Sequence, residues 1–225
     1  MPTPVQFLHD PASINSQSPA IVCIADKPAD PAALARQVIS HYLNLPINSI
    51  HLAHDPHGRP YIQNHAASLS IAHAGSVLAI ALARHGRIGV DLERIDPNFD
   101  FAPIARDHFT PAENNWLNQL PPDQRPTNFA RLWTAKEALL KALGLGLTLP
   151  MSQIEFAMEM KSDFKPEIES GANPEPRLTL HRINQSPALA AGWQIITRNV
   201  SVSGEQFSVS VVLSVGESGD QVRTC

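Results

Sequence analysis

The chain has 225 residues, of which 43% are hydrophobic, and carries a formal net charge of −4 at pH 7 with an isoelectric point near 6.2. A chain of this length can bury a substantial core as one large domain or two small ones, and its slightly acidic balance gives no general reason to bind nucleic acid. No apolar run approaches the roughly 18 residues of a membrane span, and no signal peptide is visible. With only Cys23 and Cys225, no disulfide framework is expected, so a soluble cytoplasmic protein is predicted.

The first half of the chain has the pattern of a helix followed by antiparallel strands. An apolar strand is expected over Ala20–Ala25, and Asp30 followed by Pro31 is typical of the start of a helix that continues to about Leu43. Short strands are expected near 50–53, 68–72, 77–83 and 87–93. Between the last two, Arg84, His85 and Gly86 are expected to form the turn of a hairpin.

The second half shows the same order of elements. A helix begins at Pro111, a proline-rich loop occupies 121–126, and a long helix capped by Thr127 runs to Leu143. Strands are expected near 153–158, 177–183, 192–198 and 206–213. The polar stretch 161–176 is predicted to be a mobile loop, and 216–225 a frayed tail.

The strand near 87–93 carries two acids on one face. Three apolar residues alternate with a glycine and the two acids, in the order Ile88-Gly89-Val90-Asp91-Leu92-Glu93. Because this period of two is typical of a half-buried strand, Asp91 and Glu93 share a face, with backbone positions roughly 6.5–7 Å apart. The two carboxylates repel each other unless water or a cation separates them, so this face is either solvated or binds a cation. Gly89 indicates that a ligand or another backbone approaches closely.

The long helix combines two lysines and an acid, in the order Trp133-Thr134-Ala135-Lys136-Glu137-Ala138-Leu139-Leu140-Lys141. At about 100° per residue its apolar side chains form one stripe, with Lys136 in the middle and Glu137 and Lys141 on the flank. A structural Glu137–Lys141 pair would add about 0.2–0.5 kcal/mol and leaves Lys136 unexplained. The Lys136 ammonium either extends past the stripe to water or meets an anion at its edge. An anionic ligand at the rim of the helix would account for all three side chains.

A second acid lies at the start of the preceding helix. The sequence Thr110-Pro111-Ala112-Glu113 has the form of a capping box with proline at the first helical position. The capping box alone would account for Glu113, and a catalytic role for its carboxylate is the alternative.

The strand and the helix together resemble the signature of the Sfp-type 4′-phosphopantetheinyl transferases. The family pattern is an Ile/Val-Gly-Ile/Val-Asp-x-Glu strand, followed some forty residues later by a Trp-Ser/Thr-x-Lys-Glu-Ala/Ser-x-x-Lys helix, and this chain matches both in order. Further segments are similar to family motifs: Gly58-Arg59-Pro60, Ser70-Ile71-Ala72-His73-Ala74-Gly75, Phe109-Thr110-Pro111-Ala112-Glu113 and Gly144-Leu145-Gly146-Leu147. The resemblance is close over roughly residues 34 to 160.

The resemblance implies a pseudo-duplicated α+β fold in which each half is a long helix packed on a small antiparallel sheet. The halves would be residues 1–100 and 101–215, followed by the tail at 216–225, and the site would lie between them in a monomer. It also implies transfer of the 4′-phosphopantetheine arm of coenzyme A to a serine of an apo acyl or peptidyl carrier protein, with release of adenosine 3′,5′-bisphosphate. A non-catalytic coenzyme A or carrier-binding protein and a Mg²⁺-dependent phosphohydrolase are the alternatives.

The resemblance also implies roles for individual residues. It makes Asp91, Glu93 and Glu137 the ligands of Mg²⁺, with Mn²⁺ as the alternative metal. Lys136 and Lys141 would contact the phosphates of coenzyme A, and Lys141 would also take part in catalysis. Three residues of the first half would lie near the adenosine 3′-phosphate end of coenzyme A: Arg59, Pro60 and His73. The serine proton needs an acceptor, for which Glu137 is preferred over Glu113, directly or through a metal-bound water. Without the resemblance, Arg59 is an ordinary turn residue and His73 an ordinary histidine after a strand.

Two departures from the family pattern concern the 3′-phosphate. Ala72 stands where the family often has a serine, so one hydroxyl is missing. Members of the family also often carry a basic segment before the first helix, whereas this chain has only Lys27 and Arg36 before Arg59. We therefore expect coenzyme A to be held at that end less tightly or by different residues.

Overall fold

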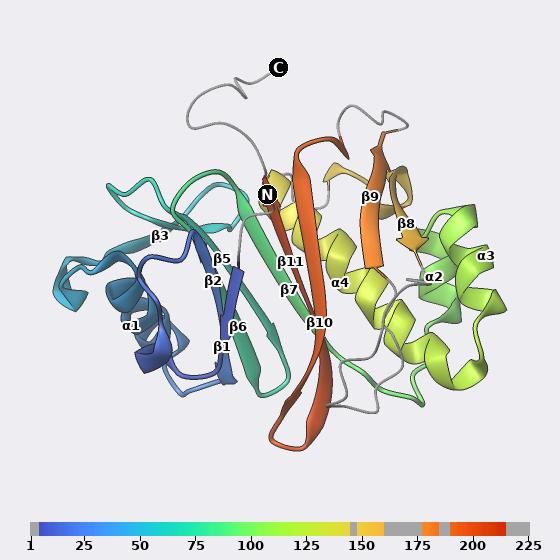
Figure 1. Ribbon diagram of the computed structural model, residues 1–225, viewed down its shortest axis with the longest axis horizontal. Helices are drawn as coiled ribbons and strands as arrows, with labels where there is room; N and C mark the ends of the chain where they lie inside the picture. The colour runs from blue at the N-terminus through green and yellow to red at the C-terminus, as the bar shows by residue number, and fades with distance from the viewer. Residues whose placement is uncertain (1–4, 145–147, 160–176, 185–189, 215–225) are drawn as a thin grey trace.

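Two sheets form the centre of the molecule, and a helix covers the outer face of each (Figure 1). The computed structural model describes residues 5–144, 148–159, 177–184 and 190–214. Within these residues the chain is a mixed α+β structure, as predicted. The predicted loop at 161–176 and tail at 216–225 lie outside the described residues.

The first sheet has the strand order β1-β2-β6-β5 and is covered by helix α1 (Pro31–Leu43). Its strands are β1 (Val5–Leu8), β2 (Ala20–Asp26), β5 (Ser68–Ala74) and β6 (Val77–Ala83); β1 runs parallel to β2 and the other pairs are antiparallel. Successive residues of β2 face opposite sides: Ile21 and Cys23 pack under α1, while Val22 and Ile24 face the second sheet. Burial on both faces explains why β2 is a continuous apolar run. A separate hairpin pairs β3 (Leu52–His54) with β4 (Pro60–Ile62).

The second sheet has the order β10-β11-β7 and combines both ends of the chain. Strand β7 (Ile88–Arg94) pairs antiparallel with β11 (Glu205–Ser214), which pairs with β10 (Trp193–Val202). The predicted hairpin over residues 84–86 is therefore wrong, because β7 leaves β6 and joins the other sheet. Its apolar side chains then enter the core between the two sheets. On its other edge, the backbone amides of Ile88 and Val90 donate to the hydroxyls of Ser68 and Ser70 on β5, at 3.2 and 3.0 Å.

The remaining elements surround helix α4 (Arg125–Leu143), which lies on the outer face of the second sheet (Figure 1). They are α2 (Ala102–His108), α3 (Pro111–Gln119) and the hairpin of β8 (Ile154–Glu159) with β9 (Arg177–Ile183). Helix α4 begins two residues before the predicted cap Thr127, and Gln124 is its N-cap without a side-chain hydrogen bond. No helix among the described residues is long and apolar enough to cross a membrane.

Helix α4 contacts β7 through backbone atoms at Gly89. A Cβ atom built on Gly89 would collide with the carbonyl oxygen of Ala138 and would lie 2.6 Å from the amide nitrogen of Ala142. The close approach that this glycine indicated is therefore that of the α4 backbone. Since Gly89, Asp91 and Glu93 alternate with the apolar residues of β7, the two acids lie on the strand face that α4 covers.

The Gly89 contact yields a stability prediction. We expect Gly89→Ala to lower the free energy of unfolding by about 3 kcal/mol or more, because the obstructing atoms are backbone and the whole helix would have to shift. Urea denaturation measures the loss. Gly204→Ala is the matched control: Gly204 has a φ of +84° and nothing within 4 Å of an added Cβ. Its cost is limited to roughly 1–2 kcal/mol for the left-handed backbone. Equal losses at the two positions would contradict the contact.

Candidate metal and phosphate site

The side chains of Asp91 and Lys141 meet where β7 passes under α4. The Lys141 Nζ donates to Asp91 Oδ1 at 2.7 Å, and Asp91 is 7% exposed. Its second oxygen, Oδ2, is buried and has no hydrogen-bond partner among the described residues. Burying a carboxylate oxygen without a hydrogen-bond partner costs free energy. Asp91 Oδ2 is therefore available to bind a cation or to accept a further hydrogen bond.

Three carboxyl groups lie within electrostatic reach of one another here. Burial raises the pKa of Asp91 to about 6, against the lowering effect of Lys141, and Glu137 adds to the increase. Desolvation also raises the pKa of Glu93, with a further contribution from Asp91. Desolvation raises the pKa of Glu137 too, and Glu93 adds to it. The negative charge of the three groups therefore exceeds what Lys141 neutralises, and the site favours additional positive charge.

The donor set suits a hard divalent cation. Carboxylate oxygens are the ligands that Mg²⁺ prefers, and it binds through one or a few of them together with water and substrate phosphate. In the described part of the chain, no group of three or more His, Cys, Asp or Glu side chains is already arranged around a common point to hold a metal ion. The three carboxyl groups fit a divalent cation in chemistry and charge. In this structure the ammonium of Lys141 is the cation that contacts Asp91.

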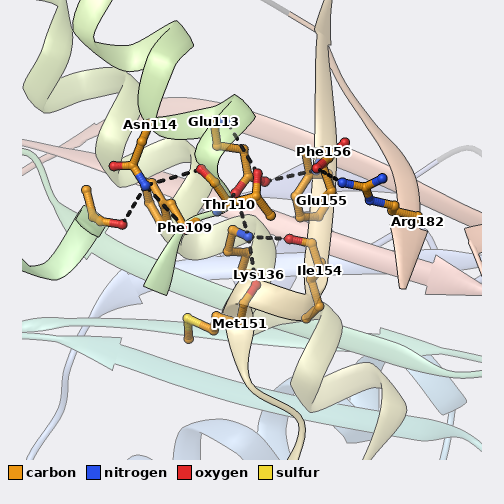
Figure 2. A network of polar contacts seen from close by, with 11 residues as sticks. Phe109, Thr110, Glu113, Asn114, Lys136, Met151, Ile154, Glu155, Phe156 and Arg182 are labelled. Carbon is orange, nitrogen blue, oxygen red and sulfur yellow. Dashed lines mark hydrogen bonds and ion pairs between the residues drawn. The ribbon is translucent and has the colours of Figure 1, made fainter. Parts of the chain in front are cut away.

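Lys136 lies in a different, fully buried network (Figure 2). Its Nζ lies 2.8 Å from Glu113 Oε2, and both side chains have no exposed surface. The same Nζ donates to the carbonyls of Met151 at 2.9 Å and Ile154 at 2.5 Å. Glu113 also accepts from the backbone amides of Thr110 at 2.8 Å and Phe156 at 2.9 Å. The network joins α3, α4 and β8, and it satisfies both charged groups.

This network corrects two sequence-based assignments. The anion that Lys136 meets is Glu113, and not a phosphate at the rim of the helix, because the ammonium is enclosed and its three donors are used. Glu113 forms the capping box with Thr110, as its sequence indicated. Its carboxylate is enclosed and paired, so it cannot receive a proton from a serine at the surface. Glu137 is the next residue of α4 after Lys136 but is only half-buried and lies near Asp91.

The buried pair yields a second prediction. Lys136→Met leaves the Glu113 carboxylate buried without its cation, which we expect to cost about 3–5 kcal/mol of unfolding free energy. The double variant Lys136→Met/Glu113→Gln removes both charges and should recover a large part of that loss. Urea denaturation of the two variants and the wild type decides the point; a double variant no more stable than the single one would contradict the pairing.

The three residues expected at the adenosine end of coenzyme A, Arg59, Pro60 and His73, lie in different surroundings. Arg59 reaches β7: its Nη2 donates to Ser68 Oγ at 3.0 Å and to the carbonyl of Ile88 at 3.4 Å. Pro60 begins β4 beside it. His73 is exposed near the end of β5, and no contact links it to the carboxylates among the described residues.

A cavity of about 280 Å³ opens beside Glu93 at the far end of β7. Four aromatic residues line it together with charged and aliphatic ones: Phe99, Phe101, Phe129 and Trp133. The rings of Phe101 and Phe129 stack with centroids 5.0 Å apart. Sequence reasoning missed this cavity, because two of its rings precede α2 and the others lie on α4. The aromatic residues shortly after the Asp-x-Glu strand were the available signal.

The raised pKa values predict how the metal-free protein responds to pH. A carboxyl group whose pKa is raised on folding binds its proton more tightly when folded, so its stabilising effect is complete at low pH and is lost as the pH rises. For Asp91, raised from 3.8 to about 6, the loss occurs between about pH 4 and pH 6 and amounts to on the order of 2–3 kcal/mol. Urea midpoints in EDTA should fall over this interval, and less steeply in Asp91→Asn. Identical pH slopes for the two proteins would contradict the buried carboxyl.

Comparison with known proteins finds one family to which part of this chain is similar. Residues 87–191 match the model of the 4′-phosphopantetheinyl transferase superfamily. The 4′-phosphopantetheinyl transferase HetI of Nostoc is 30% identical over 129 residues, 56% of this chain and 54% of its own. A 4′-phosphopantetheinyl transferase of Bacillus subtilis is 33% identical over 121 residues, covering 53% of this chain and 52% of its own. The chain therefore spans about half the length of these curated relatives.

A solved structure gives a looser match. A holo-(acyl-carrier-protein) synthase from Bacillus anthracis, in complex with CoA (3′,5′-ADP), aligns with 58% of this chain and 96% of its own, at 20% identity and a TM-score of 0.39. This likeness is too weak to locate site residues. The superfamily match over residues 87–191, however, contains the strand and the helix that meet at Gly89, so the part of the chain that bears the site is similar to the 4′-phosphopantetheinyl transferase superfamily.

Proposed function

We propose that this protein transfers the 4′-phosphopantetheine arm of coenzyme A to a serine of an apo carrier protein, releasing adenosine 3′,5′-bisphosphate. The observation that carries the proposal is the Asp91–Lys141 contact, with Glu93 and Glu137 beside it. The carboxylates provide ligands for a divalent cation and the lysine provides a charge for a phosphate. The superfamily match includes all four residues.

Asp91, Glu93 and Glu137 would hold Mg²⁺, with Mn²⁺ able to use the same oxygen donors. When bound, the metal neutralises negative charge on the pyrophosphate as the bond to the leaving group breaks. The Lys141 side chain is one-third exposed, so its ammonium would be able to turn from Asp91 to a phosphate oxygen once a cation occupied the carboxylates. Lys141 thus has two partners of the same charge, the carboxylate in the free protein and the phosphate in the complex.

Glu137 is the proposed acceptor of the serine proton. It is half-buried and its pKa is raised, which brings a carboxylate closer to the basicity that proton transfer near neutral pH requires. The bond between the serine oxygen and the β-phosphorus forms while the bond from that phosphorus to the bridging oxygen breaks. The enclosed Glu113 instead holds α3, α4 and β8 together.

Strand β7 would align coenzyme A along its length. Arg59 lies at its first residue, and the aromatic cavity lies beyond Glu93 at its other end. A substrate whose pyrophosphate lies at the carboxylates would extend its nucleotide toward Arg59 and its pantetheine arm into the cavity, where apolar walls suit a flexible amide chain. Residues 1–100 and 101–215 would act as the two halves of one pseudo-duplicated monomer.

The proposed reaction is tested by intact mass spectrometry of an apo carrier protein incubated with coenzyme A, Mg²⁺ and this protein, beside an EDTA control. We expect a metal-dependent mass gain of one phosphopantetheine. Asp91→Ala and Glu137→Ala should reduce the rate by at least about 10²-fold, because each removes a charge that acts on the transition state. Asp107→Ala removes an exposed carboxylate of α2 and should leave the rate unchanged.

Two results would overturn the proposal. Release of adenosine 3′,5′-bisphosphate at the same rate without any carrier protein would identify a phosphohydrolase. No mass gain on acyl or peptidyl carrier proteins, with coenzyme A still bound, would identify a non-catalytic binding protein. Retention of the wild-type rate by Asp91→Ala would remove that residue from the site.

A further inference from the structure

Two arginines lie together at the C-terminal end of α4. Arg87 Nη1 donates to the carbonyl of Leu143 at 2.8 Å, and Arg59 Nη1 lies 3.4 Å from where a Cβ of Gly144 would stand. Arg59 Nη2 contacts Ser68 and the carbonyl of Ile88, the residue that follows Arg87. The two side chains thus come from the β3–β4 hairpin and from the start of β7, and they converge on one place.

The two guanidinium groups repel each other. Burial lowers the pKa of Arg59, and the charge of Arg87 lowers it further, while Asp55 opposes both. Among the described residues, neither arginine forms an ion pair with a carboxylate; Asp55 Oδ1 instead accepts from the backbone amides of His57 and Arg59. Both guanidinium groups are partly buried, and their partners in the described structure are a hydroxyl and backbone carbonyls. The positive charge of the pair is therefore not neutralised by a protein carboxylate.

A structural role explains each arginine singly but not the pair. Arg87 satisfies a terminal carbonyl of α4, where a cation is favourable. A guanidinium has five N–H donors, however, and within the described structure the contacts engage one nitrogen of each side chain, Arg87 Nη1 and Arg59 Nη2. The remaining donors form two planar forks, the geometry that binds phosphate oxygens in pairs.

The position of the pair selects which phosphate it meets. Asp91 follows Ile88 by three residues, so their backbone positions lie roughly 10 Å apart along the strand. The Arg87 guanidinium is directed to the Leu143 carbonyl at the end of α4, so it is placed for a different phosphate from the one at the carboxylates. Coenzyme A carries a second phosphate, the dianion on its ribose. We propose, on the basis of the function proposed above, that Arg87 acts with Arg59 to bind the 3′-phosphate of coenzyme A.

This assignment supplies charge that the N-terminal part of the chain lacks. Before Arg59 the chain has only Lys27 and Arg36, and Arg36 lies 3.6 Å from Asp30. Arg87 instead places a cation at the start of the strand that bears Asp91 and Glu93. Arg87, Asp91 and Glu93 then lie along β7 and the residue before it, which keeps their separation constant.

The test compares coenzyme A with 3′-dephospho-coenzyme A as substrates. Arg87→Gln removes the charge and keeps a polar side chain with an amide donor. We expect its KM for coenzyme A to rise about tenfold or more with kcat little changed, and its KM for the dephospho substrate to stay at the wild-type value. Arg87→Lys, which keeps the charge without the fork, should fall between. Arg106→Gln, which removes an exposed arginine of α2, is the matched control.

Equal increases in KM for both substrates would overturn the proposal, because Arg87 would then act only through the end of α4. A second measurement separates this failure from failure of the transferase itself. Calorimetry of adenosine 3′,5′-bisphosphate and adenosine 5′-monophosphate needs no turnover. The wild type should prefer the bisphosphate, and Arg87→Gln should lose about tenfold of that preference; an unchanged preference would also overturn the assignment.

Discussion

The backbone contact between α4 and β7 at Gly89 is the constraint on which the site depends. Because no side chain separates the helix from the strand, residues that follow on each element come directly opposite one another. Asp91 lies two residues after Gly89 on β7, and Lys141 of α4 lies at hydrogen-bond distance from it. A helix usually packs on a sheet with a layer of side chains between the two backbones, and that layer would separate Asp91 from Lys141. Gly89 has no side chain, so the two backbones come into direct contact there.

The two charged clusters of α4 differ in how completely they are neutralised. Lys136 and Glu113 have a partner for each donor and acceptor around the ion pair and are enclosed, which makes them part of the core that joins α3, α4 and β8. Around Lys141 there are three acids, and one buried oxygen of Asp91 has no partner within the described structure. A complete network stabilises a fold, whereas an incomplete one at the surface can bind a ligand. The adjacent residues Lys136 and Glu137 thus belong to different parts of the molecule.

The features along β7 have an order that suits a long, unevenly charged substrate. Two arginines lie at its start, the acids and Lys141 in its middle, and an aromatic cavity past its end. In the proposed function these meet the ribose phosphate, the pyrophosphate and the pantetheine arm in turn. The strand is paired with β11 on one edge, and hydroxyls of β5 satisfy its amides on the other. It is therefore held firmly enough to keep these three positions at constant spacing.

The sequence by itself determined the local features of the site. The period of two placed Asp91 and Glu93 on one face, Gly89 marked a close approach, and the capping box explained Glu113, because each depends only on neighbouring residues. Tertiary structure alone decided that β7 pairs with β11 instead of β6, that Lys136 meets Glu113, and that Arg87 lies beside Arg59. These outcomes depend on which distant segments share a sheet or a core. Helical and strand periods show which way a side chain points and contain no information about what it will meet there.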